Sequence, residues 1–228
     1  MKIRLVIKPF LLILLILVSV ALLLNPVVAE ATLTFQYDTT FSGDMPIGPV
    51  PYLTATFTNL SPAVVRLTMS ASLSGSQFID GVNKNMNGGG GVFFNVDPSL
   101  NLNLLSIAYM SGNDADFVGL GADAFKADGS GYYDVRFAWQ HPQRDTLSGS
   151  EQAVYNFTYG GSGFSSSSFD FLSAGASSTG PYPTAAKIQG IGANDGSGWT
   201  TVPEPSTLLL LGSGLTALGL WRRKRFKN

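Results

Sequence analysis

The chain has 228 residues, of which 13% are charged and 45% are hydrophobic. Charged residues are at about half their usual share, whereas the apolar share is that of a folded protein, so the composition argues against intrinsic disorder. The sequence has no cysteine and a single histidine. The lack of cysteine excludes disulfides, thiol nucleophiles and thiolate metal sites.

The charges are segregated along the chain. Three bases lie within residues 1–8 and five within residues 222–228. Residues 32–202 hold the other six bases and 13 acids, which gives this stretch a net charge of −7. Such a stretch repels nucleic acid, so we expect no nucleic-acid partner. The basic ends are instead typical of membrane topology signals.

Residues 1–31 are predicted to be a Sec-type signal peptide. A basic start precedes the apolar run of residues 10–24, and the Asn25-Pro26 pair then breaks any helix. The small residues that follow allow signal cleavage after Ala29 or after Ala31. The apolar run is shorter than the roughly 20 residues of a full span, which favours a cleaved signal over an uncleaved anchor.

The C-terminal segment, residues 202–228, has three parts in order. A Pro203-Glu204-Pro205 box is followed by an uncharged apolar stretch and then by a basic end. We expect a C-terminal transmembrane helix whose apolar residues include Leu208, Leu209, Leu210, Leu211, Leu215, Leu218, Leu220 and Trp221. The expected stop-transfer bases are Arg222, Arg223, Lys224 and Arg225. Such bases hold their end of a helix in the cytoplasm, so the body is expected on the other side of the inner membrane.

This three-part tail resembles the PEP-CTERM sorting signal of Gram-negative bacteria. The resemblance implies that an exosortase-like membrane protease recognises the tail and cuts near the box formed by Pro203, Glu204 and Pro205. Each proline fixes its own φ and disfavours helix in the residue before it, so the box presents an extended segment to a protease.

The same resemblance implies where the protein goes. The chain is expected to be exported by its signal, anchored in the membrane until it is processed, and then placed on the cell surface or outside the cell. Many members of this group belong to biofilm-forming species that produce exopolysaccharide. Exopolysaccharide is therefore a further expected partner, and an extracellular-matrix protein is the expected class.

Residues 32–201 are predicted to form an all-β body, a single β-sandwich of jelly-roll or immunoglobulin-like type. Short runs alternate polar and apolar residues, are rich in Val, Thr, Tyr and Phe, and are separated by Gly, Asn, Asp and Ser. The predicted strands are residues 32–37, 52–58, 65–70, 91–96, 102–109, 132–139, 152–159, 168–172 and 185–191.

No residue of the body is predicted to be catalytic, and we expect a protein that is not an enzyme. The one histidine, His141, falls in a loop, and a Ser-His-Asp site would have to recruit Asp134 or Asp145. No Gly-x-Ser-x-Gly elbow is present. Asp114 and Asp116 are weak calcium candidates because they bring two acids together in an Asn- and Asp-rich loop, without the spacing of an EF-hand. Otherwise we expect no cofactor.

Several aromatic residues offer a carbohydrate-binding surface as an alternative to core packing, which is the favoured role. These residues are Tyr132, Tyr133, Trp139, Tyr182 and Trp199. The sequence thus predicts an exported, exosortase-processed surface protein with a non-catalytic body. The alternatives are a carbohydrate-binding module that is sorted in the same way and, last, a secreted hydrolase.

Overall fold

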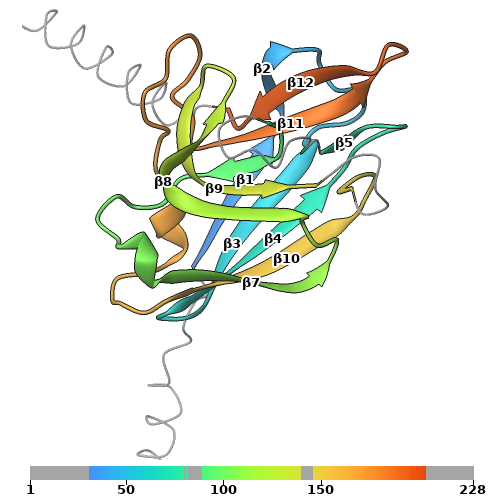
Figure 1. Cartoon of the computed structure of the whole chain (residues 1–228). Helices are drawn as coiled ribbons and strands as arrows, with labels where there is room; N and C mark the ends of the chain where they lie inside the picture. The colour runs from blue at the N-terminus through green and yellow to red at the C-terminus, as the bar shows by residue number, and fades with distance from the viewer. Residues whose placement is uncertain (1–30, 80, 82–88, 140–145, 204–228) are drawn as a thin grey trace, which may run out of the picture. The chain divides into compact units, whose positions relative to one another are not determined.

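The computed structural model describes residues 31–79, 81, 89–139 and 146–203. These residues form two antiparallel sheets, of five and seven strands, packed face to face as a sandwich (Figure 1). The all-β sandwich predicted from the alternating runs is therefore confirmed. Its assignment to a jelly-roll or immunoglobulin-like type stays a prediction. The predicted signal segment up to residue 30 and the tail from residue 204 lie outside the described residues.

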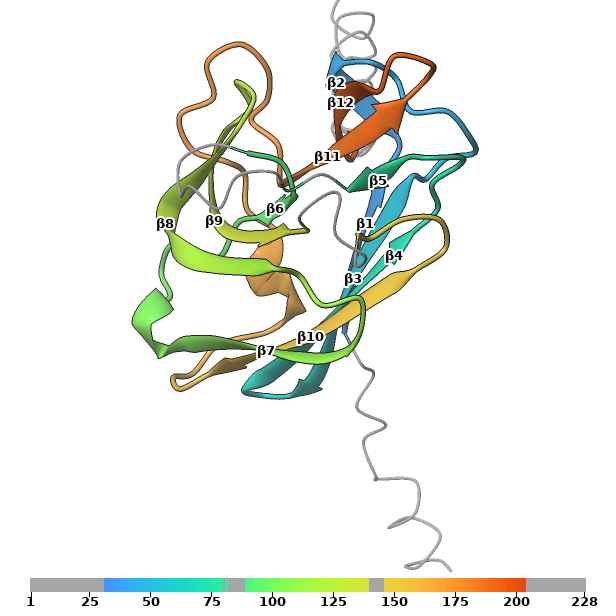
Figure 2. The same cartoon turned by 45° about the vertical axis from the view of Figure 1, so that its right-hand side comes forward.

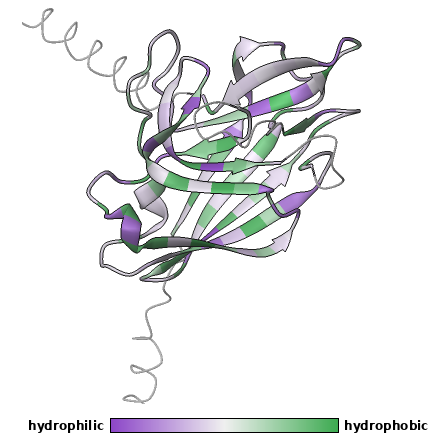
Figure 3. Cartoon of the chain, viewed as in Figure 1, coloured by the Kyte–Doolittle hydropathy of each residue, from purple (hydrophilic) through white to green (hydrophobic). Residues whose placement is uncertain are grey.

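The five-stranded sheet has the order β1-β3-β4-β10-β7. Its strands are β1 (Thr32–Tyr37), β3 (Leu53–Ser61), β4 (Val64–Ala71), β10 (Gln152–Tyr159) and β7 (Leu105–Gly112). Successive side chains of a strand point to opposite faces. In β3 the residues Leu53, Ala55 and Phe57 are fully buried, and the threonines between them are half-buried on the outer face. Figure 3 shows this alternation of apolar and polar residues along the strands.

The seven-stranded sheet has the order β2-β12-β11-β6-β9-β8, with β5 also paired to β11. Its strands are β2 (Thr39–Gly43), β12 (Gly196–Thr201), β11 (Thr184–Ile191), β6 (Val92–Phe94), β9 (Gly131–Ala138), β8 (Phe117–Ala127) and β5 (Phe78–Ile79). The short strands β5 and β6 pair with different parts of β11, as Figure 2 shows. Only Asp38 separates β1 from β2, so this segment passes from one sheet directly into the other.

The seven-stranded sheet is buried on both faces in its central strands. Val92, Phe93 and Phe94 of β6 are all buried, where a strand with one solvated face would alternate. Phe94 packs into the core between the sheets, whereas Phe93 belongs to a second apolar cluster that also contains Phe125 and Tyr133. This sheet therefore carries two apolar layers, one on each side.

The predicted strands agree well with the observed ones, with one exception. β1 and β10 have the predicted bounds, and six further predicted strands are displaced by a few residues at most. The strand predicted at residues 168–172 is wrong, because Ser166–Phe169 form the 3₁₀ helix η2. A capping box between Ser165 and Ser168 satisfies the backbone there and favours the turn over an extended strand.

A second 3₁₀ helix, η1 (Leu102–Leu104), leads into β7. Strands β2, β5, β8 and β12 were not predicted.

The core between the sheets contains a set of aromatic rings around Phe57. The Phe57 ring stacks on Phe169 at a centroid distance of 4.0 Å and meets Phe94 edge-on at 5.1 Å.

We expect Phe57→Ala to lower the free energy of unfolding by about 3–5 kcal/mol, because it leaves a cavity and removes these contacts. Urea unfolding of the full-length chain in detergent measures the change. Leu60→Ala, at the exposed end of the same strand, is the matched control and should change it by less than about 0.5 kcal/mol.

Candidate functional site

The end of β12 is the point where the chain leaves the folded body. β12 lies between β11 and β2, and its last residues pair with both, with Thr201 opposite Thr39 and Thr200 opposite Ala186. Thr200 and Thr201 are completely buried. Val202 is half-buried and Pro203 is exposed. The change from buried strand to exposed chain therefore takes two residues.

A buried network of hydroxyl groups anchors this end of β12. Thr201 Oγ1 donates to the Thr184 carbonyl at 2.7 Å, and Thr184 Oγ1 donates to the Phe93 carbonyl at 2.6 Å. The Thr184 hydroxyl also contacts the hydroxyl of Tyr37. Because Thr184 already donates its one hydroxyl proton to the Phe93 carbonyl, Tyr37 is the donor of this second bond. Burial raises the pKa of Tyr37 above its usual range, which keeps the phenol protonated as a donor. Thr184 thus connects β1, β6 and β12.

A groove of about 560 Å³ lies beside this exit and includes Val202 and Pro203 in its lining. Its other walls come from β1, through Leu33 and Phe35 among others, and from Pro183. Asp38 and Asp170 also line it. The chain thus leaves the body along an open, partly apolar groove with two acids near the exit.

Residues 201–224 match the family model of the PEP-CTERM protein-sorting motif. The chain carries this sorting motif at its C-terminus. The PEP-CTERM motif begins at Thr201, the last residue of β12, so the motif and the sheet share a residue. No curated protein matches the chain at a significant level. No solved structure does so either.

The structure places only part of the residues predicted for sorting. Pro203 lies at the exposed exit described above, whereas Glu204, Pro205, the predicted transmembrane residues and the basic end lie outside the described residues. Ala31 is exposed, and its carbonyl accepts hydrogen bonds from the Asn59 N–H and the Ser166 hydroxyl. Ala29 lies outside the described residues. Within the described ranges, no helix has the length and apolar character to cross a bilayer.

The loop predicted for calcium uses one of its acids in another bond. Asp114 Oδ1 accepts a hydrogen bond from the Tyr155 hydroxyl at 3.0 Å, and burial raises the pKa of that phenol above its usual range. Asp116 is exposed. Among the described residues, no three His, Cys, Asp or Glu side chains gather into a metal site. Calcium at Asp114 and Asp116 stays a prediction, and His141 and Asp145 lie outside the described residues.

The aromatic residues considered for sugar binding are divided between core and surface. Tyr133 and Trp139 are completely buried. Burial raises the pKa of Tyr133 to about 12, and its hydroxyl contacts Ser130 within the body. Tyr132 is 39% exposed, and Tyr182 and Trp199 are half-buried. These five residues therefore do not form one exposed aromatic surface.

Thr184 offers a direct test of how the end of β12 is held. Thr184→Val keeps the shape but leaves the buried Tyr37 hydroxyl without its acceptor, so we expect the free energy of unfolding to fall by about 1–3 kcal/mol. Adding Tyr37→Phe removes the orphaned donor and should restore part of the loss. Urea unfolding measures both variants. Thr158→Val, an exposed threonine of β10, is the control; a loss as large as that of Thr184→Val would contradict the anchoring role.

Proposed function

We propose that this protein is an exported cell-surface or extracellular-matrix protein whose non-catalytic β-sandwich is released from a membrane-anchored precursor. The PEP-CTERM motif implies export, cell-surface sorting and processing by an exosortase. The single observation that carries the proposal is the position of the motif, which begins at the last residue of β12. A cut at the Pro203-Glu204-Pro205 box leaves every strand that the structure describes intact.

The short distance between body and box shapes the processing step. Two residues, Val202 and Pro203, separate the end of β12 from Glu204, and two extended residues span about 7 Å at most. The protease therefore has to act close to the folded surface around the groove. In our proposal the body folds outside the membrane, the box is held beside it in extended form, and cleavage then frees the body from the membrane.

The proposed role in the extracellular matrix is supported by the resemblance of the tail and by the net charge of the body. Many carriers of such tails live among exopolysaccharide. The stretch of residues 32–202 has a net charge of −7, which favours solubility once the body has been released. Exopolysaccharide is accordingly the proposed partner outside the cell, and the exosortase-like protease is the proposed partner at the membrane.

The box can be tested by substitution. Glu204→Gln removes the only charge of the box, and Pro203→Ala combined with Pro205→Ala releases the backbone constraint. We expect both changes to slow processing, so that the tailed form accumulates in the membrane fraction. Electrophoresis and intact mass of fractions from cells of the native host measure the effect.

The control for this experiment is Glu151→Gln, which removes an exposed acid of the body far along the chain from the box. It should be processed like the wild type. Normal release of both box variants would contradict the proposed role of the box.

Carbohydrate binding by the body is a second candidate function, favoured by one group of rings. Phe41, Tyr182 and Trp199 are half-buried neighbours, with centroids 5.0 Å apart for Phe41 and Tyr182 and 6.3 Å apart for Phe41 and Trp199. Partly exposed rings of this kind present apolar faces on which a sugar ring stacks.

Trp199→Ala tests this candidate. If the three rings bind sugar, the variant should lose about tenfold in affinity for a neutral polysaccharide that the wild type retains, a loss of about 1.4 kcal/mol. Affinity electrophoresis against a panel of neutral polysaccharides gives the measurement. Tyr132→Ala, an exposed tyrosine outside the group, serves as the control. Wild-type protein that is retained by none of the polysaccharides would remove this candidate.

A further inference from the structure

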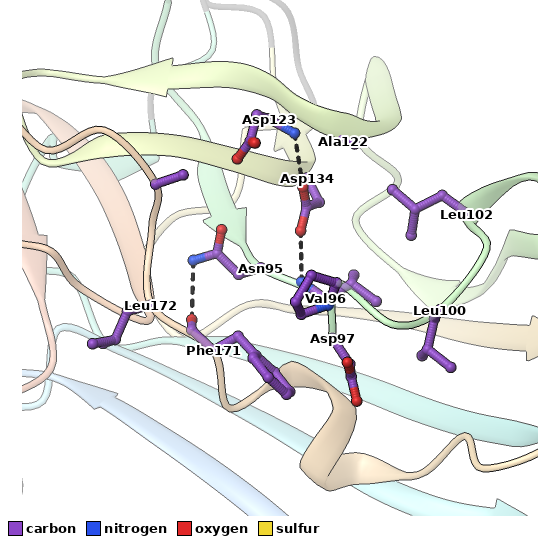
Figure 4. A pocket seen from close by; sticks show the side chains of 12 residues that line it. Asn95, Val96, Asp97, Leu100, Leu102, Ala122, Asp123, Asp134, Phe171 and Leu172 are labelled. Atoms are coloured by element: carbon purple, nitrogen blue, oxygen red, sulfur yellow. Dashed lines mark hydrogen bonds between the residues drawn. The ribbon is translucent and has the colours of Figure 1, made fainter.

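A cavity of about 250 Å³ lies where the ladder between β8 and β9 is interrupted (Figure 4). Pairing runs up to Leu120 and resumes at Phe125, so the residues between them leave the ladder. Asp134 of β9 lies next to this gap. The lining comes from the segment after β6, from the tip of the β8 irregularity and from residues 171–174. The cavity is therefore built by segments that are far apart in the sequence.

The carboxylate of Asp134 accepts backbone hydrogen bonds where the β8–β9 ladder is interrupted, one from β8 and one from the segment after β6. Its Oδ1 accepts from the Asp123 N–H and its Oδ2 from the Val96 N–H, each at 2.8 Å. Asp123 has a φ of +49°, which marks the sharp local bend in β8. Burial raises the pKa of the Asp134 carboxyl above its ordinary value, and the nearby Asp123 adds to this rise. The cavity thus has a fixed, partly buried carboxyl group in its wall.

Asn95 contributes an open acceptor to the same cavity. Its side chain is only 3% exposed, and its Nδ2 lies within hydrogen-bond distance of the carbonyls of Phe171, Pro183 and Tyr182, at 3.1, 3.2 and 3.5 Å. Three carbonyl partners identify this atom as the nitrogen. Oδ1 is left without a hydrogen-bond partner in the described part of the chain. Figure 4 shows Oδ1 directed away from Phe171, toward the side where Asp123 and Asp134 lie. A ligand N–H would satisfy this oxygen.

The polar lining consists of acceptors. The polar side chains among the described lining residues are Asn95, Asp97, Asp123 and Asp134, and no described base lines the cavity. None of these three carboxyl groups forms an ion pair within the described ranges. The remaining walls are mostly apolar, with Leu100, Leu102, Phe171 and Leu172 among them. A negative cavity with aliphatic walls and no basic side chain among its described lining therefore favours a cation that carries both N–H donors and methylene groups.

A bare metal ion fits this lining less well. The described residues bring no three acidic, His or Cys side chains close enough to share a metal ion. An ammonium group can be held by two of these acceptors with its third donor left to water, and its stem packs on leucine. The volume lies just below the usual range for drug-sized ligands, which suits a short chain.

We propose that this cavity binds the primary ammonium group of a small alkyl diamine or polyamine. One ammonium donates to Asn95 Oδ1 and to the carboxylate of Asp123, while the methylene stem packs on Leu100 and Leu102 and carries the second amino group toward Asp97. Asp134 holds the wall and adds negative charge. This binding depends neither on the sorting tail nor on sugar binding by the ring group, so each proposal fails or stands separately.

The probe for the test is 1,4-diaminobutane. The full-length chain, in a polyoxyethylene detergent at low ionic strength, is titrated by calorimetry with this diamine, with ammonium chloride and with calcium chloride. Asp97→Asn keeps an acceptor for the Ser99 N–H, and Asp123→Asn suits the positive φ, so both variants should fold. Asp195→Asn is the matched control, because Asp195 is also exposed, has a φ of +51° and lies outside the cavity.

The proposal expects the diamine to bind more tightly than ammonium, and each cavity variant to weaken its binding at least about tenfold. Asp195→Asn should bind like the wild type. Thermal unfolding of each variant separates a lost site from a lost fold. No heat of binding with wild type, or equal affinities in all variants, would overturn the proposal. Displacement of the diamine by calcium that shows the same sensitivity to the variants would overturn it in favour of a metal site.

Discussion

The hydroxyl network around Thr184 determines where the folded body ends. Thr184 is fully buried and joins β1, β6 and β12 through Tyr37, the Phe93 carbonyl and Thr201. Because a buried hydroxyl or carbonyl is costly without a partner, these bonds hold β12 in the sheet up to its last residue. The PEP-CTERM motif begins at that same residue. The body and the sorting signal are thus joined without a spacer.

The two sheets have different roles in this arrangement. The five-stranded sheet buries one face, and its outer face is lined by threonines and other polar residues, as in β3. The central strands of the seven-stranded sheet are covered on both sides, so they cannot rely on solvent to satisfy polar groups. Asp134 and Asn95 satisfy backbone groups where its ladder is interrupted. The cavity arises at this interruption, and so the same strands that stabilise the body also build this recess with its acidic lining.

Local patterns predicted the strands that alternate clearly and failed for those set by tertiary pairing. β10 reads as Gln-Ala-Val-Tyr-Asn-Phe-Thr-Tyr and was found with its true bounds, whereas β12 starts with Gly-Ser-Gly and has little strand character of its own. β8 was missed because Gly119 and Gly121 break its pattern. The sorting motif was predictable because it is a continuous segment of the sequence. Thr184, Tyr37 and the cavity residues were not, since only the pairing of distant strands brings them together.

The central claim is that the cell cuts this chain at the boundary between β12 and the membrane tail. It is tested most directly by the intact mass of the mature protein from envelope and medium, in wild-type cells and in cells that lack the sorting protease. The account predicts a wild-type product that begins after Ala29 or Ala31 and ends at the Pro203–Pro205 box, with the tailed form accumulating in the mutant. A product that keeps residues 206–228 in both strains would contradict it and would make the tail a permanent anchor.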